Sequence, residues 1–214
     1  SSGLFAVPTE TPAFTEALDF LILEDLVVAR GAEIVRLLEG QGYVREPETP
    51  TFTSPGKPTF DLVGYSTKDF SDHLSRPGFL QVMVFGDLGL VLGTEGSVDT
   101  DPAGARALSP AGFCVVKLMT VRVEKGAKDK LQALLVIAER GEDGRFRQSM
   151  SRILTRFDRD RRRDALADAQ AAFLSLQRDP EFRDRGAEGY AEFLERVEAG
   201  YQHLMEILRE ARHG

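Results

Sequence analysis

The chain has 214 residues, of which 42% are hydrophobic and 29% charged, and its formal net charge is −7. This apolar content excludes a disordered chain, and a single Cys excludes both an intramolecular disulfide framework and a multi-Cys zinc site. The negative charge disfavours a nucleic-acid coat, because phosphate binding needs a cationic surface.

The first segment, residues 1–45, is predicted to carry a helix over residues 11–40, with a break near Gly31 as the alternative to a continuous helix. Thr11 or Thr15 can cap its start, and Gly40 and Gly42 supply stop signals. Apolar residues lie on more than one face of this helix, which is typical of a helix that is buried or shared with a second protein. The run Phe20–Leu23 is also compatible with a strand.

Residues 46–60 contain four Pro together with Thr and Ser. Each Pro removes a backbone donor and favours extended geometry in the residue before it. We interpret this stretch as a linker or an arm lying on a surface, and a partner-binding segment is the alternative.

Residues 61–144 are predicted to form a small α+β sheet region. Residues 113–124 give the clearest strand, apolar on both faces and therefore central. Residues 79–85 and 88–92, joined by Gly86-Asp87, indicate a hairpin. The other expected elements are a strand at 61–65, a helix at 66–74, a long polar loop at 93–112 and a helix, in preference to a strand, at 127–140.

Residues 145–214 are predicted to form a C-terminal helical hairpin interrupted near Pro180. Its last helix has apolar residues at alternating spacings of four and three, the pattern of a coiled-coil seam. The seam consists of Tyr190, Leu194, Val197, Tyr201, Leu204 and Leu208.

These elements together predict an α+β fold. A small, mainly antiparallel β-sheet is packed by an N-terminal helix and a C-terminal helical hairpin, and the whole is expected to form one globular unit. No motif in the chain is specific enough to name a family.

Few residues suggest chemistry. Asp72 and His73 are weak catalytic candidates, and Asp69 would share a face with His73 on the helix expected at 66–74. Cys114 falls in an apolar run, where a buried thiol behaves as a small hydrophobic group. We expect no metal site and no cofactor, because zinc, calcium and phosphate-loop motifs are missing.

Arginines are concentrated in the second half. Residues 1–110 carry 7 Lys+Arg against 16 Asp+Glu, whereas residues 111–214 carry 20 against 18. Candidates for binding an anion are Arg156, Arg159, Arg161, Arg162 and Arg163. Neighbouring Asp158, Asp160 and Asp164 favour local ion pairing over a ligand site.

The leading hypothesis is a non-enzymatic structural or adaptor subunit that docks through helices onto a protein partner or a second copy. Its interface candidates are Phe20, Leu23 and Val27 together with the six residues of the C-terminal seam. One rival is a ligand-binding or enzymatic domain with loop 93–112 as a lid. Another is anion or nucleic-acid docking through Arg159–Arg163.

The most apolar stretch, residues 17–29, contains Asp19, Glu24 and Asp25, so we expect no membrane span. No basic segment precedes an apolar run as in an intact signal peptide. A soluble, cytoplasmic protein is favoured, with a processed organellar or exported form as the alternative.

Overall fold

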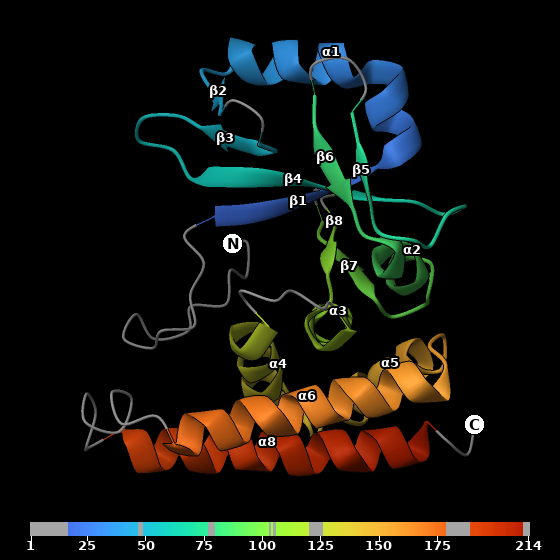
Figure 1. Ribbon diagram of the computed structural model, residues 1–214, viewed down its shortest axis with the longest axis vertical. Helices are drawn as coiled ribbons and strands as arrows, with labels where there is room; N and C mark the ends of the chain where they lie inside the picture. Colours follow the sequence, from blue (N-terminus) through green and yellow to red (C-terminus); the bar gives the residue numbers. More distant parts are fainter. Residues whose placement is uncertain are drawn as a thin grey trace. The chain divides into compact units, whose positions relative to one another are not determined.

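The computed structural model describes residues 17–46, 49–76, 80–102, 104, 106–119, 126–178 and 189–211 (Figure 1). The chain divides into two compact units, Ser1–Gly89 and Leu90–Gly214, which we describe separately. Their boundary falls inside residues 61–144, which the sequence pattern groups as one region.

The predicted fold class is confirmed: the chain is α+β, with antiparallel pairings outnumbering parallel ones among the described strands. In the first unit the elements are β1 (Ala17–Leu23), α1 (Glu24–Gly40), β2 (Val44–Arg45), β3 (Thr51–Thr53), β4 (Thr59–Tyr65), β5 (His73–Ser75) and β6 (Val82–Val84), and α2 (Gly86–Leu92) crosses the boundary.

Strand β4 is the centre of the first unit's sheet. It pairs in parallel with β1 along its whole length, and on its other side with β3 (antiparallel) and then β6 (parallel). Helix α1 packs on one face of this sheet. Its Val27 and Val35 join Phe52, Phe60 and residues of β4 and β6 in a buried cluster.

Two predictions for the start of the chain are wrong in part. The helix expected over 11–40 is instead strand β1 followed by α1, and residues 11–16 lie outside the described residues. The apolar run Phe20–Leu23 pairs with β4, so tertiary pairing outweighs local helix preference. The linker or arm expected here is also wrong in part, because residues 49–60 contain β3 and the start of β4.

The hairpin expected over 79–92 is wrong. Val82–Val84 forms β6, between β4 and β5, and Gly86–Leu92 is helical. This helix begins at Gly86, where only Gly fits, because a Cβ at this position would lie 2.0 Å from the carbonyl oxygen of Phe70. The helix expected at 66–74 is also absent: Ser66 Oγ accepts the backbone N–H groups of Lys68 and Asp69 in a turn.

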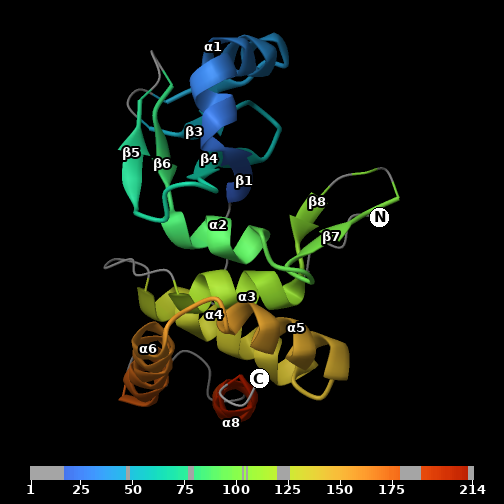
Figure 2. The ribbon, with the colours of Figure 1, turned by 90° about the vertical axis from the view of Figure 1, so that its right-hand side faces the viewer.

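The second unit is mainly helical (Figure 2). A short antiparallel hairpin precedes a set of helices around a large apolar core. The elements are β7 (Val98–Thr100), β8 (Arg106–Leu108), α3 (Pro110–Met119), α4 (Gly126–Arg140), α5 (Gly144–Leu154), α6 (Arg159–Arg178) and α8 (Tyr190–Glu210).

The strand expected at 113–124 is wrong: residues 113–119 belong to α3, and 120–124 lie outside the described residues. A segment that is apolar on every side is compatible with a buried helix as well as with a buried strand. The period of its apolar residues therefore does not distinguish the two structures. The helix at 127–140 is confirmed as α4. The stretch 93–112 contains β7, β8 and the start of α3 rather than one loop.

Helices α6 and α8 are neighbours, as the expected hairpin requires, but α8 makes its most extensive contact with α4. At Gly200 of α8 an added Cβ would lie 2.0 Å from the carbonyl oxygen of Leu134, so the two backbones nearly touch. Within the described residues, no helix is both long and apolar enough to cross a bilayer.

Candidate functional site

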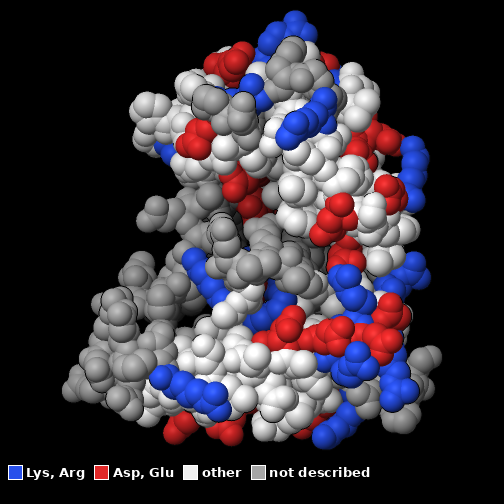
Figure 3. Space-filling view, viewed as in Figure 1, with Lys and Arg blue, Asp and Glu red and all other residues white. Residues whose placement is uncertain are grey.

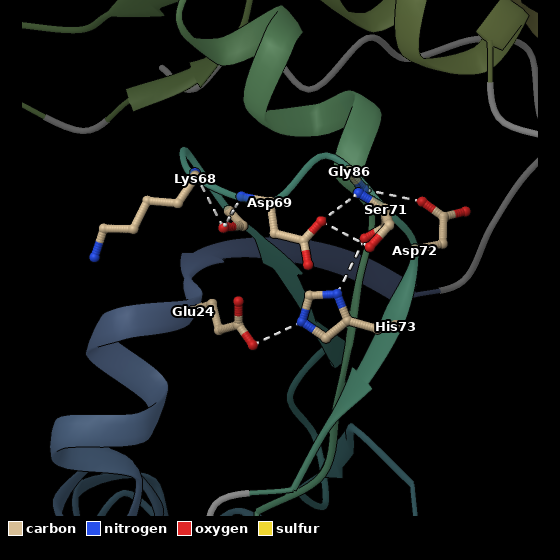
Figure 4. Close-up of polar contacts among 8 residues, drawn as sticks. Glu24, Lys68, Asp69, Ser71, Asp72, His73 and Gly86 are labelled. Atoms are coloured by element: carbon tan, nitrogen blue, oxygen red, sulfur yellow. Dashed lines mark hydrogen bonds and ion pairs between the residues drawn. The ribbon is translucent and has the colours of Figure 1, made fainter.

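Polar residues of the first unit gather where its three parallel strands end (Figure 4). Glu24 follows β1, the turn at Ser66–Asp72 follows β4, and Gly86 follows β6. We call Glu24, Lys68, Asp69, Ser71, Asp72 and His73 the carboxyl-end cluster. Open sheets with parallel strands commonly bind ligands at this edge, so the cluster is a candidate site.

His73 is held between two hydrogen-bond acceptors. Its Nε2 lies 2.8 Å from Glu24 Oε1, and its Nδ1 lies 3.0 Å from the carbonyl oxygen of Ser71. Both nitrogens can donate at once only in the imidazolium form. The pKa of His73 is accordingly raised, first by the bond to Glu24 and then by the Ser71 carbonyl.

The two aspartates of the cluster order its loop. Asp69 Oδ1 accepts from Ser71 N at 2.9 Å and from Ser71 Oγ at 2.7 Å, and the hydroxyl bond is the largest cause of a lowered Asp69 pKa. Asp72 Oδ1 accepts from Gly86 N at 2.9 Å, which joins the loop to the start of α2. The expected Asp69–His73 helix pair is wrong, because no helix forms there.

The carboxyl-end cluster fastens segments of its own unit to one another, and we call this arrangement of bonds the clasp. Its carboxylates bond to groups of the same unit, and Lys68 Nζ lies 2.6 Å from Asp25 on the surface. Among the described residues, no three His, Cys, Asp or Glu side chains could hold a metal ion. A groove with a volume of about 610 Å³ lies in the second unit, between α5 and the end of α8.

The arginine candidates are largely engaged within the second unit. Arg161 and Arg162 donate to the backbone carbonyls of Met119 and Ala211, and Arg163 pairs with Asp160 and Asp164. Arg156 and Arg159 are exposed. The space-filling view shows cationic and anionic side chains intermixed over these helices, which is typical of local ion pairing (Figure 3).

The C-terminal seam lies against its own unit. Val197, Leu204 and Leu208 are buried in the core, and Leu194 and Tyr201 are partly buried against it. Tyr190 donates its hydroxyl to the carbonyl of Leu176 at 3.2 Å. Three of the six side chains are therefore buried within the unit and three are partly buried.

Val27 and Cys114 are also fully buried. The Cys114 thiol donates to the carbonyl oxygen of Ala133 at 3.7 Å, and burial raises its pKa. A thiol in such a place is a packing group, because reactive cysteines need an exposed, electropositive setting.

Apolar surface is exposed on β1 and α1 of the first unit. Phe20 is 52% exposed although its ring makes an edge-to-face contact with Phe60, and Leu23 is partly buried. On α1, Leu26 and Leu37 are 42% and 63% exposed. Sequence reasoning missed Leu26 as an interface residue. Spacing alone does not place Leu26 and Leu37 on one face, because the backbone of α1 is non-helical at Arg30 between them.

Comparison with known proteins found no matching family model, no matching curated protein and no matching solved structure.

Proposed function

We propose that this chain is a non-enzymatic docking subunit that binds an amphipathic helix of a partner protein through the outer face of α1. The docking surface consists of Leu26, Arg30, Glu33 and Leu37, which we call the α1 stripe. The observation that supports this most strongly is Leu37, a large apolar side chain that is 63% exposed in a helix whose other face is packed.

The α1 stripe follows a helix that bends at Arg30, whose backbone angles (φ −134°, ψ 16°) are non-helical. Leu26 precedes this bend and Leu37 follows it, so the two exposed leucines lie on two successive helical segments. The inner side of α1 has its own set, Val27, Gly31 and Val35, all buried. The helix thus packs one side on the sheet and exposes a leucine on each of its two segments, which we propose as the contacts for a partner helix.

The charged residues at the middle of the stripe indicate which side chains a partner helix should carry. The Arg30 guanidinium pairs with the Glu33 carboxylate, and both side chains are exposed between the two leucines. A partner helix that places apolar side chains over Leu26 and Leu37 would meet these charges with an acid opposite Arg30 and a base opposite Glu33. Such pairs set partner choice and orientation more than affinity.

The test is purification of the full chain from its native source, with quantification of proteins that co-purify reproducibly. The double substitution Leu26→Gln/Leu37→Gln removes the apolar contacts of the stripe, and the double exchange Arg30→Glu/Glu33→Arg reverses its charges while keeping an internal ion pair. We expect both to reduce the specific partner at least tenfold, because the first removes the apolar contacts and the second places like charges opposite those of the partner.

The matched control is Leu174→Gln, since Leu174 is an exposed leucine of α6 in the second unit. This variant should retain the partner at the wild-type level. Equal recovery of every co-purifying protein from the stripe variants and the control would contradict the proposal, and circular dichroism establishes that each variant is folded.

A further inference from the structure

We propose that the groove between α5 and the end of α8 binds a small molecule through its phosphate group, with Arg152 as the anchor of the phosphate. The proposal concerns the second unit and does not depend on the docking function of α1. The groove's volume of about 610 Å³ lies in the range of small-ligand sites. All but one of its lining residues belong to α5 or follow it directly, and the exception is Glu210 of α8.

The α5 side of the groove is basic. Residues 144–157 contain four Arg and neither Asp nor Glu, and Arg145 and Arg156 are exposed. The carboxylate of Glu210 pairs with Arg147, so its charge is balanced within the groove wall. A bound anion therefore meets an excess of positive charge, which favours the double charge of a phosphate ester over the single charge of a carboxylate.

Three side chains of α5 present hydrogen-bond donors to the groove. Ser151 and Arg152 follow Gln148 by three and four residues, so the three lie on one side of the helix. Within the described part of the chain, the Gln148 amide and the Ser151 hydroxyl have no hydrogen-bond partner. Together with the planar fork of Arg152 they can bond the oxygens of one phosphate.

Arg152 is held by a carboxylate that an incoming anion can replace. Its Nη1 lies 2.7 Å from Glu95 Oε2, and the two side chains are 41% and 85% exposed. Solvent screens such a pair, so it contributes little to stability. Arg147 differs, because its guanidinium is mostly buried and bonds to both Glu206 and Glu210. We therefore assign Arg147 to fastening α5 onto α8, and Arg152 to the ligand.

The proposal can be tested by titrating the full chain with inorganic phosphate and with glucose 6-phosphate, at an ionic strength kept constant with chloride. Backbone amide shifts in ¹⁵N–¹H NMR spectra report the binding. We expect saturable shifts around Ser151 and Arg152, and tighter binding of the sugar phosphate, because the groove leaves room for its carbon skeleton. Glucose alone should cause no shift. Equal affinities for the two phosphates would overturn the assignment to an ester.

Two substitutions test Arg152 as the anchor. Arg152→Gln should weaken binding of glucose 6-phosphate at least tenfold, because it removes a charged, bidentate donor. Glu95→Gln should lower the dissociation constant about threefold, because the phosphate no longer displaces a carboxylate from an exposed ion pair. A purely structural role of the Arg152–Glu95 pair does not predict tighter binding. Unchanged or weaker binding by Glu95→Gln would therefore contradict the competition.

The matched control is Arg163→Gln. Arg163 is an exposed arginine of α6 that pairs with Asp160 and Asp164 and does not line the groove, so this variant should bind as the wild type does. The amide spectra also show whether each variant is folded. A wild-type chain without saturable shifts in the groove would overturn the proposal. Equal weakening by Arg152→Gln and Arg163→Gln would also overturn it, since general charge attraction would then explain the binding.

Discussion

Helix α8 of the second unit and helix α1 of the first both carry side chains at the alternating spacing of a helical seam, yet they use it differently. In α8 the seam packs against the helices of the same unit, and Val197 and Leu204 are in the core. In α1 the stripe of Leu26 and Leu37 faces outward. The α8 seam runs along a continuous helix, whereas α1 bends at Arg30 between its two exposed leucines, so spacing along the sequence identifies a packing face only where the helix is regular.

The largest effect on stability is expected from a substitution that forces α8 away from α4. In Gly200→Val the new side chain would overlap the carbonyl of Leu134, a backbone group that cannot rotate away. We expect a loss of at least about 4 kcal/mol in the free energy of unfolding. Denaturant titration measures it, and Gly144→Ala is the control, because a Cβ there has no atom within 4 Å.

The second test compares two leucines of opposite burial. Leu134 is 0% exposed, so Leu134→Ala removes packed methyl groups and should cost about 3 kcal/mol. Leu37→Ala should change the free energy of unfolding by less than about 0.5 kcal/mol, since its side chain is largely in solvent. Similar losses at both positions would show that Leu37 is packed and would remove the main support for the α1 stripe.

The third test concerns the buried ion pair of the second unit. Lys117 Nζ lies 2.7 Å from Asp129 Oδ1, and both side chains are largely buried. Asp129→Ala leaves the ammonium without its carboxylate, and we expect a loss of about 2 kcal/mol in the free energy of unfolding. Adding Lys117→Met removes the unpaired charge and should restore part of this loss, whereas an unchanged double variant would contradict the explanation.

A smaller effect is expected from the clasp of the first unit, through pH. The pKa of folded His73 is raised by Glu24 and by the Ser71 carbonyl. Its stabilisation is therefore complete below the unfolded histidine pKa of about 6.5 and is lost as the pH rises through the folded value.

Unfolding midpoints at several pH values between about 6 and about 8 measure this effect. Stability of the wild type should fall relative to His73→Gln as the pH rises across this range. The difference between the two proteins removes the contribution of the groups that they share. A difference that is constant with pH, or that grows, would contradict the bonding assigned to His73.

The smallest effect should come from the surface pair Lys68–Asp25, whose two side chains are mostly exposed. Solvent screens such a pair and the long lysine side chain loses entropy when held, so Lys68→Ala should leave the unfolding midpoint within experimental error. A clear drop would mean that the loop after β4 depends on this pair as well as on Asp69 and Asp72.

The sequence predicts the fold class and the helix at 127–140, and the structure confirms both. For residues 127–140 the pattern is compatible with helix and with strand, and the preference for helix is correct. It fails where residues are apolar on every side: residues 113–119 form α3 rather than a strand, and Phe20–Leu23 lies in β1 rather than a helix. Long-range pairing decides these cases, and a local pattern does not contain it.

The candidate site shows the same limit. His73 stands out in the sequence, but its partner Glu24 is 49 residues away and is brought close only by the parallel pairing of β1 with β4. Asp69, the expected partner, lies in a turn built by Ser66 and Ser71. Arg161 and Arg162, chosen for their charge, donate to carbonyls that only the packed helices bring near.

The measurement that tests the docking account most directly is recovery of the native partner by the full chain carrying Leu26→Gln/Leu37→Gln, beside wild type and Leu174→Gln. The account predicts that a reproducible partner is recovered with wild type and with Leu174→Gln, and falls at least tenfold in the α1 stripe variant while that variant remains folded. Undiminished recovery with the stripe variant, or the absence of any specific partner of the wild-type chain, would contradict it.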